Sequence, residues 1–117
     1  MGYEFTQAVY DVVTLVPAGT AVTYGDVAEL LGAGGPRQVG AAMSTAPAGL
    51  PWWRVVRADG TLREDLAERA AGRWRAEGLP CRGGDPERLR FPEARWQPSE
   101  ADFEALDAIA ARLIPKV

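Results

Sequence analysis

The chain has 117 residues, 47% of them hydrophobic and 25% charged, which is the composition of one ordinary globular domain. No stretch is long and apolar enough to predict a membrane span, and the first residues lack the pattern of a signal peptide. The net charge of -3 does not by itself indicate a nucleic-acid partner. Because the chain has no histidine and one cysteine, Cys81, we expect no disulfide, metal site or cofactor, and the lone thiol suits a reducing cytoplasm.

The first third of the chain predicts two helices. Residues 4–16 repeat apolar side chains at helical spacing and stop before Pro17, which predicts an amphipathic helix. Thr23 and Asp26 stand three residues apart, the spacing of a capping box. They predict the start of a second, shorter helix that runs to Leu31.

A glycine-rich turn over residues 32–35 precedes a third predicted helix. Pro36 favours the first turn of a helix, and the pattern continues to about Thr45. Two short helices around a tight turn form a helix-turn-helix pattern, which is typical of DNA-binding domains. Many helical proteins pack two helices in this way without binding DNA, so the pattern alone leaves simple packing open.

The middle of the chain predicts a small hairpin and one more helix. Residues 52–57 form the first strand, Asp59-Gly60 is a typical hairpin turn, and residues 61–62 give a short return strand. A helix follows over residues 64–77. Residues 89–91 predict another short strand.

A last helix is predicted after Ser99, which has capping spacing to Asp102. We therefore expect a domain over residues 1–98 and a helical extension over residues 99–117. The predicted fold class is α/β, mostly α: a winged-helix-like DNA-binding domain with a helix-turn-helix, a small β-hairpin wing and an extra C-terminal helix.

Several motifs stand in a fixed order along the chain. They are Val22-Thr23-Tyr24-Gly25-Asp26, Pro36-Arg37-Gln38-Val39-Gly40, Pro51-Trp52-Trp53-Arg54-Val55 and Asp59-Gly60. In this order they resemble the DNA-binding domain of the O6-alkylguanine-DNA alkyltransferases, from about Phe5 to Gly78. That family has its alkyl-accepting cysteine where this chain has Trp52. The substitution is typical of the alkyltransferase-like proteins, which bind alkylated DNA without repairing it.

The chemistry of alkyl transfer agrees with this resemblance. Transfer needs a thiolate activated by a base, and Trp52 has no nucleophilic atom. Trp53 stands where the resemblance places the histidine that relays the proton. Glu77 resembles the acid that orients this histidine, and we expect it to form a structural ion pair with Arg54. Cys81 matches no nucleophile motif, so the chain is not expected to be an enzyme.

The resemblance implies a protein that turns a damaged base out of the duplex before inspecting it. It assigns Tyr24 to crowding the phosphate beside the target nucleotide. It assigns Arg37 to the vacated space, where a planar guanidinium can stack and hydrogen-bond. Trp52 and Trp53 are expected to form the lesion pocket, but neighbours on a regular strand point to opposite sides, so a core position for Trp53 is the alternative.

Two positions depart from the family pattern. Ala46 stands where the family often has an asparagine that braces the pocket loop. Asp65 stands where some alkyltransferase-like proteins place an arginine against the lesion. Arg63 and Arg69 are therefore the candidates for a lesion or DNA contact.

We predict non-catalytic recognition of O6-alkylguanine in double-stranded DNA. The resemblance adds nucleotide excision repair proteins as partners, and we expect a cytoplasmic, nucleoid-associated monomer with no membrane partner. One alternative is a winged-helix regulator that reads DNA sequence and keeps a vestigial pocket. Another is an interaction module without DNA binding, which the acidic total charge would suit. Binding to matched duplexes with and without O6-methylguanine separates these functions.

Overall fold

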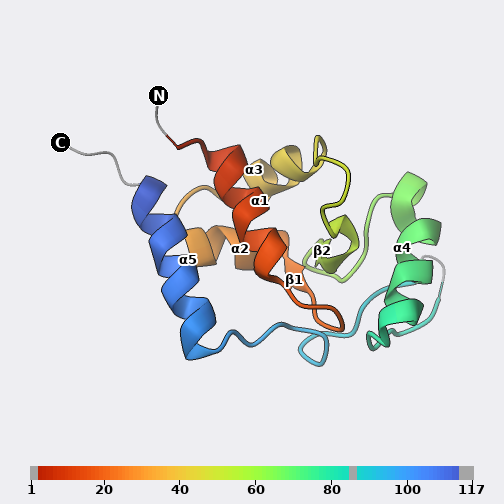
Figure 1. The fold of residues 1–117 in the computed structure, drawn as a ribbon. Helices are drawn as coiled ribbons and strands as arrows, with labels where there is room; N and C mark the ends of the chain where they lie inside the picture. The colour runs from red at the N-terminus through yellow and green to blue at the C-terminus, as the bar shows by residue number, and fades with distance from the viewer. Residues whose placement is uncertain (1–2, 85–86, 114–117) are drawn as a thin grey trace.

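Helices dominate the computed structural model, which describes residues 3–84 and 87–113 (Figure 1). They are α1 (Phe5–Leu15), α2 (Tyr24–Leu31), α3 (Pro36–Met43), α4 (Glu64–Glu77) and α5 (Glu100–Leu113). Between them lie strands β1 (Val22–Thr23) and β2 (Val55–Val56) and the 3-10 helix η1 (Trp52–Arg54). The molecule measures 50 × 29 × 23 Å, and α4 stands apart from the other helices. Across the described ranges, no helix is long and apolar enough to cross a membrane.

Local sequence explains where α2 and α5 begin. The Thr23 hydroxyl accepts a 3.0 Å hydrogen bond from the Asp26 N–H, and the Asp26 carboxylate accepts one from the Thr23 N–H. Ser99 and Asp102 repeat this arrangement at the start of α5. Both predicted capping pairs are confirmed. They could be predicted from sequence because each depends only on two residues three positions apart.

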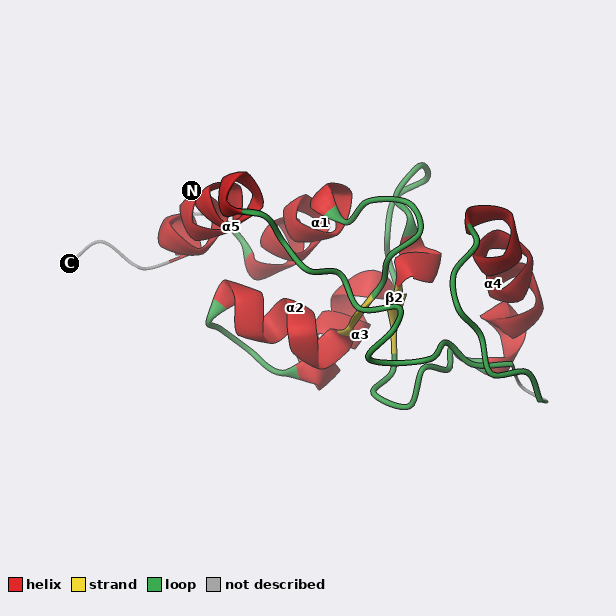
Figure 2. Cartoon of the chain, turned by 90° about the horizontal axis from the view of Figure 1, so that it is seen from below, coloured by secondary structure: helices red, strands yellow, loops and turns green. Residues whose placement is uncertain are grey.

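The helix-turn-helix consists of α2 and α3. Gly32 and Gly34 adopt left-handed φ angles of 64° and 68° in the turn between them. Helix α1 packs on both, and α5 packs on α1 and α2 (Figure 2). Leu106 of α5 is only 1% exposed within this group of helices. The division of the chain at residue 98 stays a prediction.

The small sheet differs from the predicted hairpin. β2 pairs in parallel with β1, with Val22 opposite Val55, instead of antiparallel with the segment after the turn. The other side of β1 is bordered by residues 94–96, because Ala21 exchanges backbone hydrogen bonds of 2.8 and 2.9 Å with this segment. The partner of each strand is thus set by distant parts of the chain.

The predicted wing is present as a turn without a return strand. The Arg57 N–H donates to the Thr61 carbonyl at 2.9 Å, which closes the turn, but Leu62 leaves the ladder and is buried near α4. Gly60 adopts a φ of 85°, and a Cβ there would lie 2.4 Å from the Leu89 carbonyl oxygen. The strand predicted at residues 89–91 is limited to a single bridge between Leu89 and Cys81.

Two apolar clusters form the interior. The first joins α1, α2, α3 and α5 and includes Trp96, which is 5% exposed. The second lies against α4 around Trp74, which is fully buried. Tyr24 and Trp52 pack against both clusters. The seam between the clusters therefore contains two of the residues singled out from the sequence.

Candidate nucleic-acid interface

A central hollow of about 210 Å³ opens at this seam. Its wall comes from α2, α3, η1, β2, the start of α4 and the loop after α3. Its lining is mostly apolar, with one phenol, one serine hydroxyl and two guanidinium groups. The lining residues are Tyr24, Gly40, Met43, Ser44, Ala46, Trp52, Val55, Leu62, Arg63, Leu66 and Arg69. An apolar concavity with few polar groups is the usual form of a ligand site.

Tyr24 is the first residue of α2 and lines the central hollow. Its ring lies against α3, where a Cβ added to Gly40 would make an ordinary 3.6 Å contact with it. Burial raises the pKa of the Tyr24 phenol, and the positive charges of Arg57 and Arg63 offset part of this effect. The phenol is therefore protonated near neutral pH and can donate a hydrogen bond to a phosphate or a base.

Arg37 lies outside the hollow, on the exposed first turn of α3. It precedes Gly40 by three residues, so the two lie about 4.5 Å apart along the helix axis. Among the described residues, no carboxylate forms an ion pair with Arg37. Its guanidinium is thus available to a ligand that covers the hollow.

The 3-10 helix η1 replaces the start of the strand predicted at residue 52. The Arg54 N–H donates to the Pro51 carbonyl at 3.1 Å, and the Val55 N–H donates to the Trp52 carbonyl. Because of this turn, the rings of Trp52 and Trp53 do not point to opposite faces. They meet at 87° with centroids 5.7 Å apart.

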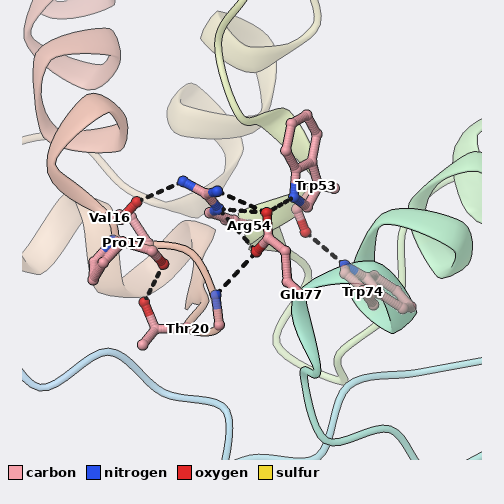
Figure 3. A network of polar contacts seen from close by, with 8 residues as sticks. Val16, Pro17, Thr20, Trp53, Arg54, Trp74 and Glu77 are labelled. Atoms are coloured by element: carbon pink, nitrogen blue, oxygen red, sulfur yellow. Dashed lines mark hydrogen bonds and ion pairs between the residues drawn. The ribbon is translucent and has the colours of Figure 1, made fainter.

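Of the two rings, only Trp52 lines the central hollow. The Trp53 indole Nε1–H donates to Glu77 Oε2 at 2.8 Å, and the Trp53 carbonyl accepts a 2.7 Å hydrogen bond from the Trp74 indole (Figure 3). Trp53 therefore does not line this hollow, and a part for both rings in one lesion pocket stays a prediction. The physical reason for the position of Trp53 is the hydrogen bond from its indole to Glu77, which holds the Trp53 ring beside the end of α4.

Arg54 and Glu77, paired from the sequence, form a tight ion pair with 2.7 Å between Arg54 Nη2 and Glu77 Oε2. Their side chains are only 16% and 13% exposed. Arg54 Nη1 also donates to the Val16 carbonyl at 2.9 Å, and the Gly19 N–H donates to Glu77 at 3.1 Å (Figure 3). The pair therefore ties η1 and the end of α4 to the loop after α1.

Burial alone would raise the pKa of Glu77. Hydrogen bonds from Arg54, Gly19 and Trp53, together with the Arg54 charge, outweigh burial and hold the pKa below its usual value. Glu77 is thus a carboxylate at neutral pH with every near neighbour acting as a donor. A partly buried charge with this many donors is well compensated.

The two arginines that line the hollow differ in their contacts. Arg63 pairs with Asp65 at 3.1 Å, and both side chains are exposed. The Arg69 guanidinium lies over the Trp52 ring, 5.5 Å from its centroid. One helical turn later, the guanidinium of Arg73 lies 4.5 Å from the centroid of Trp53. Sequence reasoning missed Arg73, although its spacing of four from Arg69 on a predicted helix was a usable signal.

Backbone hydrogen bonds hold the loop that the family often braces with asparagine. The Ala46 N–H donates to the Met43 carbonyl at 3.1 Å, and the Trp52 N–H donates to the Leu50 carbonyl at 2.8 Å. These bonds shape the loop without a side-chain brace at Ala46, whose small side chain leaves space in the hollow.

Cys81 lies apart from the central hollow, beside Arg82 and Phe91 in a separate concavity. Burial raises the pKa of its thiol, and the negative charge of Glu87 raises it further. A raised pKa disfavours the thiolate that nucleophilic attack requires. Within residues 3–84 and 87–113, no group of acidic or cysteine side chains comes together that could hold a metal ion.

These features define a class of protein: a winged-helix-like, helix-turn-helix protein with an aromatic hollow beside its second helix. The family model described as 6-O-methylguanine DNA methyltransferase, DNA binding domain, matches residues 4–79. The chain belongs to this family. Helix α5 lies outside the matched residues.

Several relatives are similar over most of this chain. The DNA base-flipping protein of Escherichia coli is 46% identical over 101 residues, which are 80% of this chain and 74% of the relative. Alkyltransferase-like protein 1 of Schizosaccharomyces pombe is 34% identical over 104 residues, which are 81% of this chain and 96% of the relative.

Solved structures show the same fold. S. pombe Atl1, in complex with damaged DNA containing O6-carboxymethylguanine, matches with a TM-score of 0.71 and 33% identity over 80% of this chain and 95% of its own. The O6-methylguanine methyltransferase of Mycobacterium tuberculosis matches with a TM-score of 0.58 and 30% identity, over 66% of this chain and 50% of that chain. The first of these bears on function, because the matched chain is bound to damaged DNA.

Proposed function

We propose that this protein recognises O6-alkylguanine in double-stranded DNA without repairing it, and that it takes the flipped base into the central hollow. The observation that carries the proposal is the position of Trp52. Its ring lines the central hollow, which borders both α2 and α3. The motif resemblance aligns Trp52 with the alkyl-accepting cysteine of the alkyltransferases. An indole cannot accept an alkyl group, but it can stack on a base.

The energy balance of base flipping suits this arrangement. Stacking on an aromatic side chain contributes about 1–3 kcal/mol per base, and unpairing and unstacking cost a few kcal/mol. An alkylated guanine pairs poorly and therefore costs less to flip than guanine. Selectivity for the lesion thus comes partly from the DNA and partly from the hollow.

Two residues outside the stacking contact would assist flipping. Tyr24 lies at the hollow on the first turn of α2, where its protonated phenol can meet a phosphate. Arg37, exposed on the first turn of α3, can enter the stack and pair with the orphaned base. Both belong to the helix-turn-helix, so one docked orientation would bring both to the DNA.

The proposal includes the absence of alkyl transfer. The motif resemblance aligns Trp52 and Trp53 with the family's acceptor and relay positions. Cys81 lies in a separate concavity, and burial raises the pKa of its thiol. The relatives with the names base-flipping protein and alkyltransferase-like protein support a non-catalytic role. We further propose that the bound protein flags the lesion for nucleotide excision repair proteins, in a cytoplasmic, nucleoid-associated setting.

Two duplexes of unrelated sequence, each with and without one O6-methylguanine, test this function. Lesion recognition gives tighter binding to the damaged duplex in both sequences. A sequence-reading regulator would instead prefer one sequence whether or not it carries the lesion. An interaction module would bind none of the four duplexes.

A further inference from the structure

Trp53 is fixed at several points although it lies outside the hollow. Its indole N–H donates to Glu77 and its carbonyl accepts from the Trp74 indole (Figure 3). Two guanidinium groups lie over its ring, that of Arg54 at 5.5 Å from the centroid and that of Arg73 at 4.5 Å. The hydrogen bond to Glu77 and the two guanidinium contacts together restrain the rotamer of the Trp53 side chain.

The side chain of Trp52 has weaker anchors. In the part of the chain that the structure describes, its indole donates no hydrogen bond, whereas Trp53 and Trp74 both donate theirs. Its ring packs against both apolar clusters, and the contacts that orient it are the perpendicular one with Trp53 and the guanidinium of Arg69. The orientation of the ring that borders the hollow therefore depends on its neighbour.

We propose that Trp53 is a positioning residue for lesion recognition, which holds the Trp52 ring against the central hollow through its hydrogen bond to Glu77 and its perpendicular contact with Trp52. This role rests on the proposed function. Trp53 acts through Trp52 and does not touch the flipped base.

The physical reason is preorganisation. A ring that swings between rotamers in the free protein must be ordered when the base arrives, and this ordering weakens binding. The Glu77 carboxylate is itself fixed by Arg54 and the Gly19 N–H, so the anchor of Trp53 is rigid. Tryptophan supplies both a donor for Glu77 and a large ring for Trp52. Unlike a histidine, its N–H does not titrate near neutral pH.

The variant Trp53→Phe tests the role because it keeps an aromatic ring beside Trp52 but cannot donate the hydrogen bond to Glu77. Its matched control is Trp96→Phe, the same change at a buried tryptophan of the first cluster. In protein labelled with 5-fluorotryptophan, Trp53→Phe should shift or broaden the 19F resonance of Trp52, assigned with Trp52→Phe. Trp96→Phe should leave that resonance unchanged.

Binding measurements connect this order to recognition. Trp53→Phe should lower the preference for lesion DNA over matched DNA by roughly threefold to tenfold, as expected for one side chain that must be ordered on binding. Glu77→Ala, which removes the acceptor, should lower the preference too. The double variant should lose less than the two single losses combined, because both changes remove the same hydrogen bond. In a Trp52→Ala background, Trp53→Phe should cause no further loss of preference.

The outcomes separate this role from others. If Trp53→Phe reduces stability but leaves the lesion preference intact, Trp53 is only structural and the proposal is overturned. If its loss persists in the Trp52→Ala background, Trp53 contacts the lesion itself, which overturns the proposal as well. If the wild-type protein shows no lesion preference, the proposed function fails together with this role.

Discussion

Replacing Trp52 by alanine should remove one stacking contact from the complex with lesion DNA. The guanidinium of Arg69 lies over the Trp52 ring and Trp53 meets the ring at a right angle. We therefore count a single stacking contact between Trp52 and the base. One such contact is worth about 1–3 kcal/mol. The dissociation constant for a duplex with O6-methylguanine should therefore rise by roughly 5- to 150-fold in Trp52→Ala.

Titrations with two duplexes and one fluorescence signal measure this effect. Affinity for the undamaged duplex should hardly change, since it depends on phosphate contacts that Trp52 does not make. Lesion DNA should quench wild-type tryptophan emission more than matched DNA does, and this excess should vanish in Trp52→Ala. Trp96→Phe is the control, whereas Trp74→Phe is not, because the Trp74 indole holds the Trp53 carbonyl. A folded Trp52→Ala protein that discriminates as well as the wild type would refute the reasoning.

Three further predictions follow from the same geometry. Arg37→Ala and Tyr24→Phe should weaken binding to lesion DNA more than binding to undamaged DNA. Equal losses of affinity for both duplexes would show that these two residues only contact the DNA phosphate backbone. Because the pKa of Glu77 is lowered in the folded state, its stabilising effect is complete above its unfolded pKa and is lost as pH falls through the folded pKa. Acid titration of unfolding should therefore show a shallower decline in Glu77→Gln, and identical slopes would contradict this. Incubation with methylated DNA should leave Cys81 unmodified in mass spectra, since its raised pKa disfavours a thiolate, and stoichiometric methylation would contradict the non-catalytic reading.

The parts of the fold that sequence reasoning predicted depend on nearby residues. The starts of α2 and α5 follow from capping pairs three residues apart, and the end of α4 follows from Gly78 with a φ of 71°. In each case the deciding contact lies within a turn of the residue or on one face of a helix.

What the sequence did not predict depends on distant partners. The aromatic and β-branched residues among positions 52–57 are typical of a strand. Hydrogen bonds back to Pro51 and Trp52 nevertheless wind the first half of this segment into η1. β2 pairs with β1 because the helix-turn-helix brings them together, which no local pattern encodes. Glu77 sets the direction of the Trp53 ring from 24 residues away.

The candidate site shows the same division. Tyr24 and Trp52 were selected by a family resemblance, and the structure brings both to one hollow. The stacking of Arg69 and Arg73 on consecutive rings requires α4 to lie beside η1, which is a tertiary arrangement. Spacing on the helix predicted only that the two arginines share a face.

A crystal structure of this protein with a duplex that carries one O6-methylguanine tests the central claim most directly, because it locates the damaged base. We predict a base rotated out of the duplex and stacked on Trp52 in the central hollow, with its methyl group intact and Arg37 in the vacated space. A damaged base that remains stacked in the duplex, with the hollow empty, would contradict the account.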